Sequence, residues 1–469
     1  MDTQAKQQLT FDPPGPGPWD LDSLHFPRPV TAYWAEMHPE PFSLGFGDMT
    51  AYYGTPIKTR LTAYPNGFCY SQTVPVGPEE FPARVQRAAE VFERKLWRDS
   101  AQDWHEVRKP ASMKANSDIQ AVDPDQLTDA ELVDHLRRCR DNHVAMIRQH
   151  MAFTGTAVLS PGDFLVHVGQ WTGLPTVKLL GLMRGASTVS GGSSGPHAAM
   201  VAAYRADEAA RKELDSDEDP GALLERLRRE PSATGQALNE YLDLVGCRLL
   251  DGFDISNHYA LELPDVLLRS ITTAIDEPDR ESDLDQQVAE IRSQVPEEHR
   301  EEYDALLEEA RIGYSVRDER GVYGDVWASG LMRRAAMAAG RRLAERGRIQ
   351  DAEHFAFAGI DEMSAILEGA ATPTADDLAA RLEYHHTYTA KDAPGHLGDE
   401  APPPPDPSQL PPPMARVMAA IGTALGEMFA SSEEEHEDKV IRGLGASSGV
   451  REGRVRRVAG ASDFDRIQK

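Results

Sequence analysis

Residues 129–153 read DAELVDHLRRCRDNHVAMIRQHMAF, and this stretch decides the fold class. Its apolar residues recur at steps of three and four, the spacing that places side chains on one face of an α-helix. Thr128 stands directly before the stretch and Glu131 follows three residues later, which is the capping-box pattern of a helix start. The stretch therefore predicts a long amphipathic helix that begins after Thr128.

The same periodicity extends over most of the chain. It starts after Pro78 with PARVQRAAEVFERKLWRD. Further helices are predicted for 198–214, 221–229, 234–249, 297–317, 321–347 and 375–387. We therefore expect a mainly α protein with a multi-helix body.

The N-terminal part has a different composition. Residues 11–75 are rich in proline, glycine and aromatic residues, and TRLTAYPNGFCYSQTVPV alternates around Asn66-Gly67. An Asn-Gly pair between alternating runs is a strong hairpin signal. The sequence therefore predicts a small β element near the N-terminus.

Three compositions succeed one another near the C-terminus. Residues 401–413, APPPPDPSQLPPP, contain too much proline for a helix or a central strand. A last helix is predicted from Met414 to Ala430. The acidic run SSEEEHED, residues 431–438, should stay solvated. This order is typical of a linker that contains one helix.

Charge and cysteine content narrow the functional classes. The 469 residues include 49 Lys and Arg against 76 Asp and Glu, a formal charge of -27. Such a surface repels phosphate backbones and anionic lipid, so we expect neither nucleic acid nor membrane as a partner. Three widely spaced cysteines favour a reducing compartment, and no stretch approaches about 18 uninterrupted apolar residues. We therefore expect a cytoplasmic protein.

Several stretches, in order along the chain, resemble the PEP-utilising enzymes, the family of PEP synthase, rifampin phosphotransferase and phenylphosphate synthase. Those that resemble its acceptor-binding domain are HFPRPVTAY, PNGFCY, LLGLMRGAST, LNEYLDLVGCRLLDGFDIS and VRDERGVYGDVWASGLMRRAAMAAGRRLAERGRIQDAEHFAFAGIDEM. Cys247 stands where a histidine is common in the family. The C-terminal GLGASSGVREGRVRRV resembles the opening of the swivelling phosphohistidine domain.

The resemblance implies phosphotransfer in two steps. In the family, an ATP-binding domain passes the β-phosphate of ATP to a histidine of the swivelling domain. This histidine then phosphorylates a hydroxyl group or pyruvate on the acceptor-binding domain. The chain contains no GxxxxGK[ST] loop, and it stops before a carrier histidine of the expected kind. We therefore expect ATP and Mg²⁺ to be used by a separate domain or subunit, and expect the chain alone neither to hydrolyse ATP nor to phosphorylate an alcohol.

The resemblance also implies three parts. Residues 1–395 correspond to a mostly helical acceptor-binding domain. Residues 396–440 form the Pro-rich and acidic linker, and residues 441–469 correspond to the first strands of the swivelling domain. Residues 395–469 should pack weakly, because a carrier must visit two sites.

The family's Arg-Glu-Asp-type motif marks the expected catalytic cluster: Arg317, Asp318, Glu319 and Arg320. Phosphoryl transfer needs cations at the phosphoryl oxygens and a carboxylate for the hydroxyl proton. The arginines are thus the expected clamp and Glu319 the expected base, with Asp318 as the next candidate. Family sites often carry a lysine where this chain has Gly321, so Arg320 would replace it, or Arg333 and Arg334 would point inward from the next helix. The alternative is a solvated salt-bridge patch between two helices.

Other side chains are expected to line the acceptor pocket: His25, Trp171, His197, Tyr323, Trp327 and Arg333, with Tyr33 and Trp34 as further aromatic candidates. His197 allows two interpretations. SGGSSGPH resembles the phosphohistidine signature with one residue too many, which would make His197 the carrier. We favour a Gly-rich loop that lines the pocket.

One face of the helix at 129–153 offers metal-binding side chains: His135, Cys139, His143 and His150. No second cluster supplies the remaining ligands, and Arg138 and Arg140 crowd the same turn. We therefore favour packed or surface histidines and predict no metal site.

The acceptor is inferred from charge. A strongly anionic chain with few candidate cations favours a neutral, largely apolar alcohol or phenol over pyruvate. Its phosphorylation is either the end of the reaction or the activating step of an ATP-driven dehydration. Two other interpretations stay open: a non-catalytic regulatory or scaffolding subunit, and a binding protein for a small hydrophobic ligand.

Overall fold

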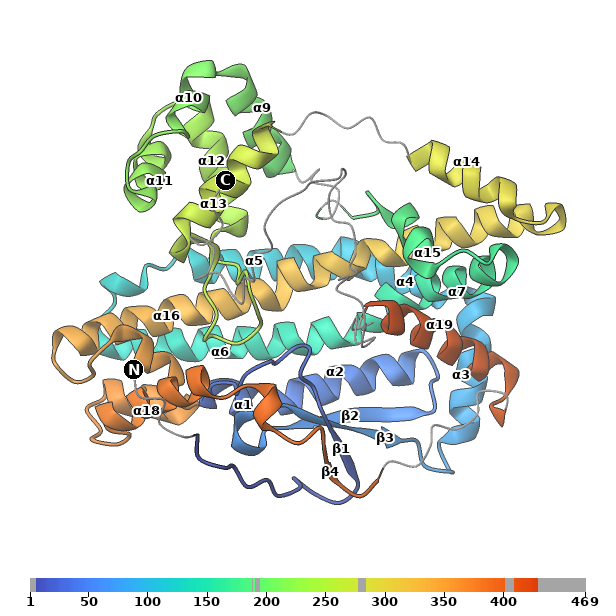
Figure 1. Cartoon of the computed structure of the whole chain (residues 1–469), viewed down its shortest axis with the longest axis horizontal. Helices are drawn as coiled ribbons and strands as arrows, with labels where there is room; N and C mark the ends of the chain where they lie inside the picture. Colours follow the sequence, from blue (N-terminus) through green and yellow to red (C-terminus); the bar gives the residue numbers. More distant parts are fainter. Residues whose placement is uncertain (1–5, 188, 190–194, 277–283, 401–408, 429–469) are drawn as a thin grey trace.

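The computed structural model describes residues 6–187, 189, 195–276, 284–400 and 409–428. These residues form a mainly helical protein with one small sheet near the N-terminus, which confirms the predicted fold class (Figure 1). The helices of the first half are α1 (Ala32–Met37), α2 (Pro39–Tyr52), α3 (Phe81–Arg94), α4 (Leu96–Asp103), α5 (Lys109–Gln120), α6 (Asp129–Ala152), α7 (Thr154–Thr172) and α8 (Thr176–Leu180). Those of the second half are α9 (Gly195–Ala206), α10 (Glu208–Glu213), α11 (Pro220–Arg229), α12 (Ala233–Val245), α13 (Pro264–Asp276), α14 (Leu284–Gln294), α15 (Arg300–Arg320), α16 (Val326–Glu345), α17 (Ile360–Leu367), α18 (Ala375–Thr387) and α19 (Pro412–Met428).

The sheet is antiparallel, with the strand order β2-β3-β1-β4. Its strands are β1 (Pro18–Leu21), β2 (Ile57–Ala63), β3 (Tyr70–Pro75) and β4 (His396–Gly398). The predicted hairpin is confirmed, because β2 and β3 pair around a turn in which Asn66 and Gly67 have φ of 52° and 77°. Positive φ at consecutive residues is the reason that Asn-Gly suits such turns. The sequence did not predict β4, which pairs with β1 through Trp19 and Leu397.

Most predicted helices are present, with changes at their ends. The capping box before α6 is formed by Thr128 and Glu131. The helix expected at 198–214 is split, because the Asp207 side chain accepts hydrogen bonds from two backbone amides and starts α10. The helix expected at 234–249 ends at Val245. A π-helical segment, η7 (Gly321–Asp325), joins α15 to α16 where one continuous helix was expected from residue 321.

Helix α7 is the central element of one half of the body. It packs along α15 on one side and along α19 on another. Glycines permit both contacts: a Cβ at Gly313 of α15 would overlap Ser160 of α7, and a Cβ at Gly162 of α7 would overlap the carbonyl oxygen of Ala420 in α19. Backbones therefore approach closely at both interfaces.

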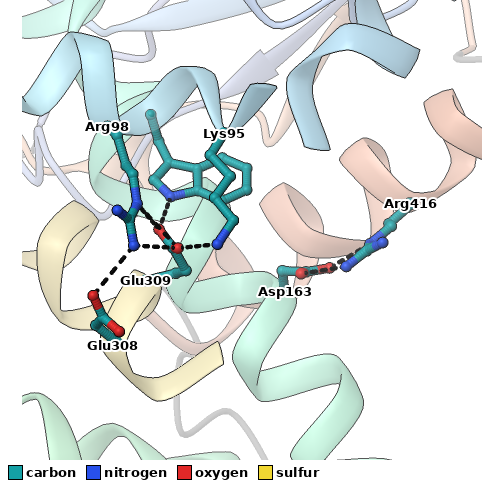
Figure 2. Close-up of polar contacts among 7 residues, drawn as sticks. Lys95, Arg98, Asp163, Glu308, Glu309 and Arg416 are labelled. Atoms are coloured by element: carbon teal, nitrogen blue, oxygen red, sulfur yellow. Dashed lines mark hydrogen bonds and ion pairs between the residues drawn. The ribbon is translucent and has the colours of Figure 1, made fainter. Parts of the chain in front are cut away.

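The packing of α19 and β4 corrects the expectation of a loosely packed linker at 396–440. Met414, Val417 and Ala420 of α19 are buried. Arg416 binds the buried Asp163 of α7 through two hydrogen bonds of 2.9 and 2.8 Å (Figure 2). The expected weak packing is therefore wrong for these two elements. The proline run at 401–408, the acidic run and the strands expected at 441–469 lie outside the described residues.

A second buried carboxylate holds the neighbouring helices together. Glu309 of α15 accepts hydrogen bonds from Lys95, Trp97 and Arg98, with Lys95 Nζ at 2.5 Å (Figure 2). Glu309 is 4% exposed, so these partners compensate for its removal from water.

Helices α9 to α13 gather in a lobe beside the long helices (Figure 1). The lobe has its own hydrophobic core, which includes Tyr204, Leu227, Leu238, Leu242 and Ile271. In the described part of the chain, no helix combines the length and apolar character that crossing a bilayer requires.

Candidate functional site

A cavity of about 210 Å³ lies where the sheet meets α2, α6, η7 and α19. Its wall is largely apolar and aromatic, formed by Phe26, Trp34, Phe42, Phe46, Ile147, Met151, Phe253 and Leu425. Polar side chains converge on the same space: Asp22, His25, His38, Arg60, His150, Arg320 and Asp325. An apolar cavity with a few convergent polar groups is typical of a small-molecule site.

The chain places these walls through contacts between distant segments. Thr31, at the start of α1, donates backbone and side-chain hydrogen bonds of 2.8 and 2.7 Å to the buried Asp254. The contact fixes the loop that carries Phe253, whose ring lies 6.3 Å from that of Phe26. Residues far apart in the chain thereby close one wall.

Arg320 is the buried cation of the cavity. It ends α15, is 9% exposed, and its Nη1 donates to the carbonyl oxygen of Arg317. Its Nε finds no hydrogen-bond partner, and the guanidinium forms no ion pair, among the described residues. Burial lowers the pKa of Arg320 to about 10. A buried cation without a carboxylate partner favours an anionic ligand.

A histidine and a carboxylate form a pair beside Arg320. His150 Nδ1 lies 2.8 Å from Asp325 Oδ1, and both side chains line the cavity. His150 comes from α6 and Asp325 from η7. In a π-helical segment the hydrogen bonds run from residue i to i+5, which brings Asp325 to the same side as Arg320, five positions earlier.

A second pair lies near the N-terminal strand. His25 Nδ1 is 2.9 Å from Asp22 Oδ2. Burial raises the pKa of Asp22, but the hydrogen bond and charge of His25 outweigh this effect and hold it below its usual value. His38, also in the wall, has its Nδ1 2.8 Å from the Tyr64 hydroxyl, and burial lowers the pKa of His38 to about 3, so it is neutral.

The four residues of the expected catalytic cluster lie on different faces of α15. Only Arg320 lines the cavity. Glu319 is buried on another face, where it accepts from Trp104 Nε1 at 3.1 Å and pairs with Lys109 at 2.9 Å. Its predicted use as the base for a hydroxyl in this cavity therefore does not fit the geometry.

The other two members of that cluster face each other. Arg317 bonds to Asp318 at 3.0 Å and to the Tyr314 hydroxyl at 3.1 Å. Neither Arg317 nor Asp318 lines the cavity. The interpretation as a local salt bridge describes this half of the cluster.

The expected pocket residues are also divided. His25 and Trp34 line the cavity. Tyr33, Tyr323 and Trp327 lie in the hydrophobic core, and the Trp327 indole donates a 2.7 Å hydrogen bond to Gln120. None of these three lines the cavity.

The remaining candidates are engaged elsewhere. Arg333 is fully buried and bonds to Glu262 and Glu353, each at 2.6 Å. Trp171 stacks on His299 with ring centres 4.6 Å apart. His197, in α9 of the lobe, packs edge-on against Tyr241 at 5.5 Å. None of these residues lines the cavity, so the expected substrate contacts at Arg333, Trp171 and His197 do not belong to it.

The histidines and the cysteine on one face of α6, which were considered as metal ligands, contact different partners along the helix. Cys139 Sγ lies 3.7 Å from His135 Nε2, and His143 lies between the Tyr33 and Ser329 hydroxyls at 3.0 and 2.7 Å. Among the described residues, no group of three or more His, Cys, Asp or Glu side chains has an arrangement that fits a metal ion.

Asp22, Asp325 and the His150–Asp325 contact were missed by sequence reasoning. His150 and Asp325 are 175 residues apart, so no local pattern joins them. The one available signal was the interval of five from Arg320 to Asp325, which becomes meaningful only if the segment is π-helical.

A comparison with protein families supplies an independent finding. Residues 169–320 match the family described as the rifampicin phosphotransferase fourth domain. The matched region runs from α7 through the lobe to Arg320. A search of curated proteins gives no match to the chain. Over residues 169–320, the chain is therefore similar to a domain of the PEP-utilising enzyme family, which confirms the resemblance over this region.

Proposed function

We propose that this chain is the acceptor-binding component of a phosphotransferase of the PEP-utilising type. The acceptor is a small, mostly apolar alcohol or phenol, and its hydroxyl group receives the phosphoryl group from a phosphohistidine. The family match supports the phosphotransferase class. The observation that carries the proposal is the buried guanidinium of Arg320, which forms no ion pair among the described residues and lines a largely apolar cavity.

Arg320 has the chemistry that a transferring phosphoryl group requires. A buried guanidinium without a carboxylate partner is costly, and a phosphoryl group supplies the missing negative charge when it arrives. The planar fork of arginine binds two phosphoryl oxygens at once. In the proposed reaction Arg320 stabilises the negative charge on these oxygens during transfer.

The cavity indicates the size of the acceptor. Its volume of about 210 Å³ is below the range of about 300–1,000 Å³ that is usual for drug-sized ligands. A macrocycle such as rifampicin, named in the matched family, is too large to be enclosed in it. Aromatic rings on several sides favour a flat acceptor of about one ring, because offset and edge-on contacts then form with the walls.

ATP and Mg²⁺ belong, in this proposal, to a separate domain or subunit that charges the phosphohistidine. The carrier then meets the acceptor at the cavity. The phosphate ester formed is either the product or the leaving group of a dehydration, and analysis of the products would distinguish these outcomes. A non-catalytic subunit or a simple carrier of hydrophobic ligands is the competing interpretation.

Binding of phenol and phenyl phosphate, measured by isothermal titration calorimetry, tests the proposal. Arg320→Met keeps the length and apolar stem of the side chain but removes its charge. It should weaken binding of phenyl phosphate about 10- to 100-fold, because a hydrogen bond to a charged group contributes about 1.5–3 kcal/mol. Phenol, which carries no phosphate, should bind both proteins with similar affinity.

Arg317→Met is the matched control, because Arg317 is the neighbouring arginine that does not line the cavity. Its affinity for phenyl phosphate should equal that of the unmodified protein. Equal binding of phenyl phosphate by the Arg320→Met protein would contradict the proposal. Tight binding of phenol without any binding of phenyl phosphate would support the ligand-carrier interpretation instead.

A further inference from the structure

His150 presents one ring nitrogen to a carboxylate and leaves the other available. Nδ1 lies 2.8 Å from Asp325 Oδ1, and Nε2 has no partner among the described residues. When a carboxylate accepts the Nδ1 proton, the neutral imidazole carries its lone pair on Nε2. The arrangement is that of a general base oriented by a carboxylate.

The burial of the pair differs between its two members. The Asp325 side chain is 10% exposed and the His150 side chain 21% exposed. Both side chains line the cavity, but the carboxylate is more enclosed than the imidazole. A ligand in the cavity can therefore reach the imidazole ring.

Gly321 lies next to Arg320 in the chain and close to the His150–Asp325 pair in space. It follows Arg320 directly, and a Cβ built on it would lie 3.7 Å from His150 Cε1. Position 321 therefore faces the imidazole ring. The family that the chain resembles often has a lysine at this position. With glycine here, the residue after Arg320 contributes no cation, and the side-chain atom nearest to it is His150 Cε1.

We propose that His150 Nε2 accepts the proton of the acceptor's hydroxyl group during phosphoryl transfer, with Asp325 as its positioning residue. The acceptor oxygen forms the new bond to phosphorus, and the bond between phosphorus and the carrier histidine breaks. The electron pair of that bond stays on the carrier nitrogen, and the hydroxyl proton moves to Nε2. Asp325 stabilises the imidazolium that results. This inference rests on the proposed function, since it requires a hydroxyl compound in the cavity.

The spectrum of bound 4-nitrophenol tests this proton transfer without any turnover, because its phenolate and phenol forms absorb at different wavelengths. The measurement is made at a pH where the free compound is mostly protonated. The unmodified protein should bind it with a clear phenolate band. His150→Gln, which keeps a polar side chain but removes the base, should reduce the phenolate fraction at least ~10-fold at saturation. Asp325→Asn should reduce it partly, because the imidazolium loses its carboxylate.

His396→Gln is the matched control, because His396 is also paired with a carboxylate, Asp20 at 3.0 Å, but does not line the cavity. It should leave the phenolate band in place. An unchanged band in His150→Gln, a band lost equally in His396→Gln, or wholly neutral 4-nitrophenol in the unmodified protein would each overturn the inference and leave the proposed function standing. Failure to bind 4-nitrophenol at all would overturn both.

Discussion

Two buried arginines show how the surroundings of one residue type determine its effect on stability. Arg333 is enclosed by Glu262, Glu353 and the carbonyl oxygen of Ile255. Arg320 has only the carbonyl oxygen of Arg317 among the described residues. Although both guanidiniums are buried, only Arg333 forms ion pairs with carboxylates among the described residues. The burial of Arg320 therefore lowers the free energy of unfolding more than the burial of Arg333 does.

Arg320→Met is expected to stabilise the ligand-free protein. Burial lowers the pKa of Arg320 to about 10, below its usual 12.5, so at every pH below about 10 the folded protein holds a charge that is more stable in the unfolded chain. This difference corresponds to roughly 3 kcal/mol. The substitution should raise the free energy of unfolding at pH 7 by about 1–3 kcal/mol, measured by urea denaturation.

Arg333→Met provides the comparison, because it leaves two carboxylates without their partner. It should lower the free energy of unfolding by about 3–5 kcal/mol. Equal destabilisation by the two substitutions would show that Arg320 is not an uncompensated charge.

At this scale the sequence predicted part of the site. Arg320, His25 and Trp34 were named in advance and line the cavity. Glu319 does not line this cavity because neighbours in a helix point in directions about 100° apart, so one member of a run of four reaches a given cavity. Asp325 was missed because its alignment with Arg320 depends on the π-helical segment.

Among the elements, α7 shows why the spacing of apolar residues does not predict every helix. Its sequence contains Pro161 and three glycines, and thirteen of its residues are buried. A helix that is buried on nearly every side has no polar face, so its apolar residues show no repeat of three and four. In a sequence-based prediction, the proline and glycines also indicate the end of a helix. The amphipathic α6 was therefore predicted almost to the residue, whereas α7 was not predicted.

Gly162→Ala tests the close contact between α7 and α19. The added methyl group would overlap the Ala420 carbonyl oxygen, so α19 must shift. The free energy of unfolding should fall by about 1–3 kcal/mol, the usual effect of overpacking. Amide hydrogen exchange in α19 should become faster.

Gly169→Ala is the control within the same helix, because a Cβ there meets nothing within 4 Å. Alanine is the better helix former, so this variant should be stabilised by about 0.5–1 kcal/mol. The close contact would be refuted by a Gly162→Ala protein as stable as the Gly169→Ala protein.

For the whole molecule, buried histidines set the response to acid. Burial lowers the pKa of His38 to about 3 and that of His143 to about 4. Both are neutral in the folded state, whereas the unfolded chain binds these protons at pH values near 6.5. Stability is therefore present above about pH 6.5 and declines as the pH falls toward 4.

His143→Gln should flatten this decline. The difference in unfolding free energy between pH 7 and pH 5, measured by urea denaturation, should shrink by about 2 kcal/mol. Tyr33→Phe removes a hydrogen bond to His143 but keeps the imidazole, so it should lower stability by similar amounts at both pH values. A decline in His143→Gln as steep as in the unmodified protein would assign the acid response to other groups.

The pairing of strands that are far apart in the sequence was the least predictable feature of the fold. The hairpin of β2 and β3 follows from its own residues, but the pairing of β1 with β4 joins Trp19 to Leu397. Short strands carry little pattern, and nothing local indicates which distant strand completes an edge. The sequence thus predicted the class of the fold and its local units but not which distant segments pair.

The cavity can form only when segments far apart in the sequence have come together. Its wall includes Asp22 and Leu425, and among the described lining residues only Phe253 and Arg320 fall within 169–320. A chain made from its N-terminus forms most of its helices before residue 425 has left the ribosome, and contacts of such sequence separation form slowly. During refolding, capacity to bind a phenol should therefore appear after helical content has recovered. Residues 169–320 alone would therefore contain Arg320 but lack nearly all of the other residues that line the cavity.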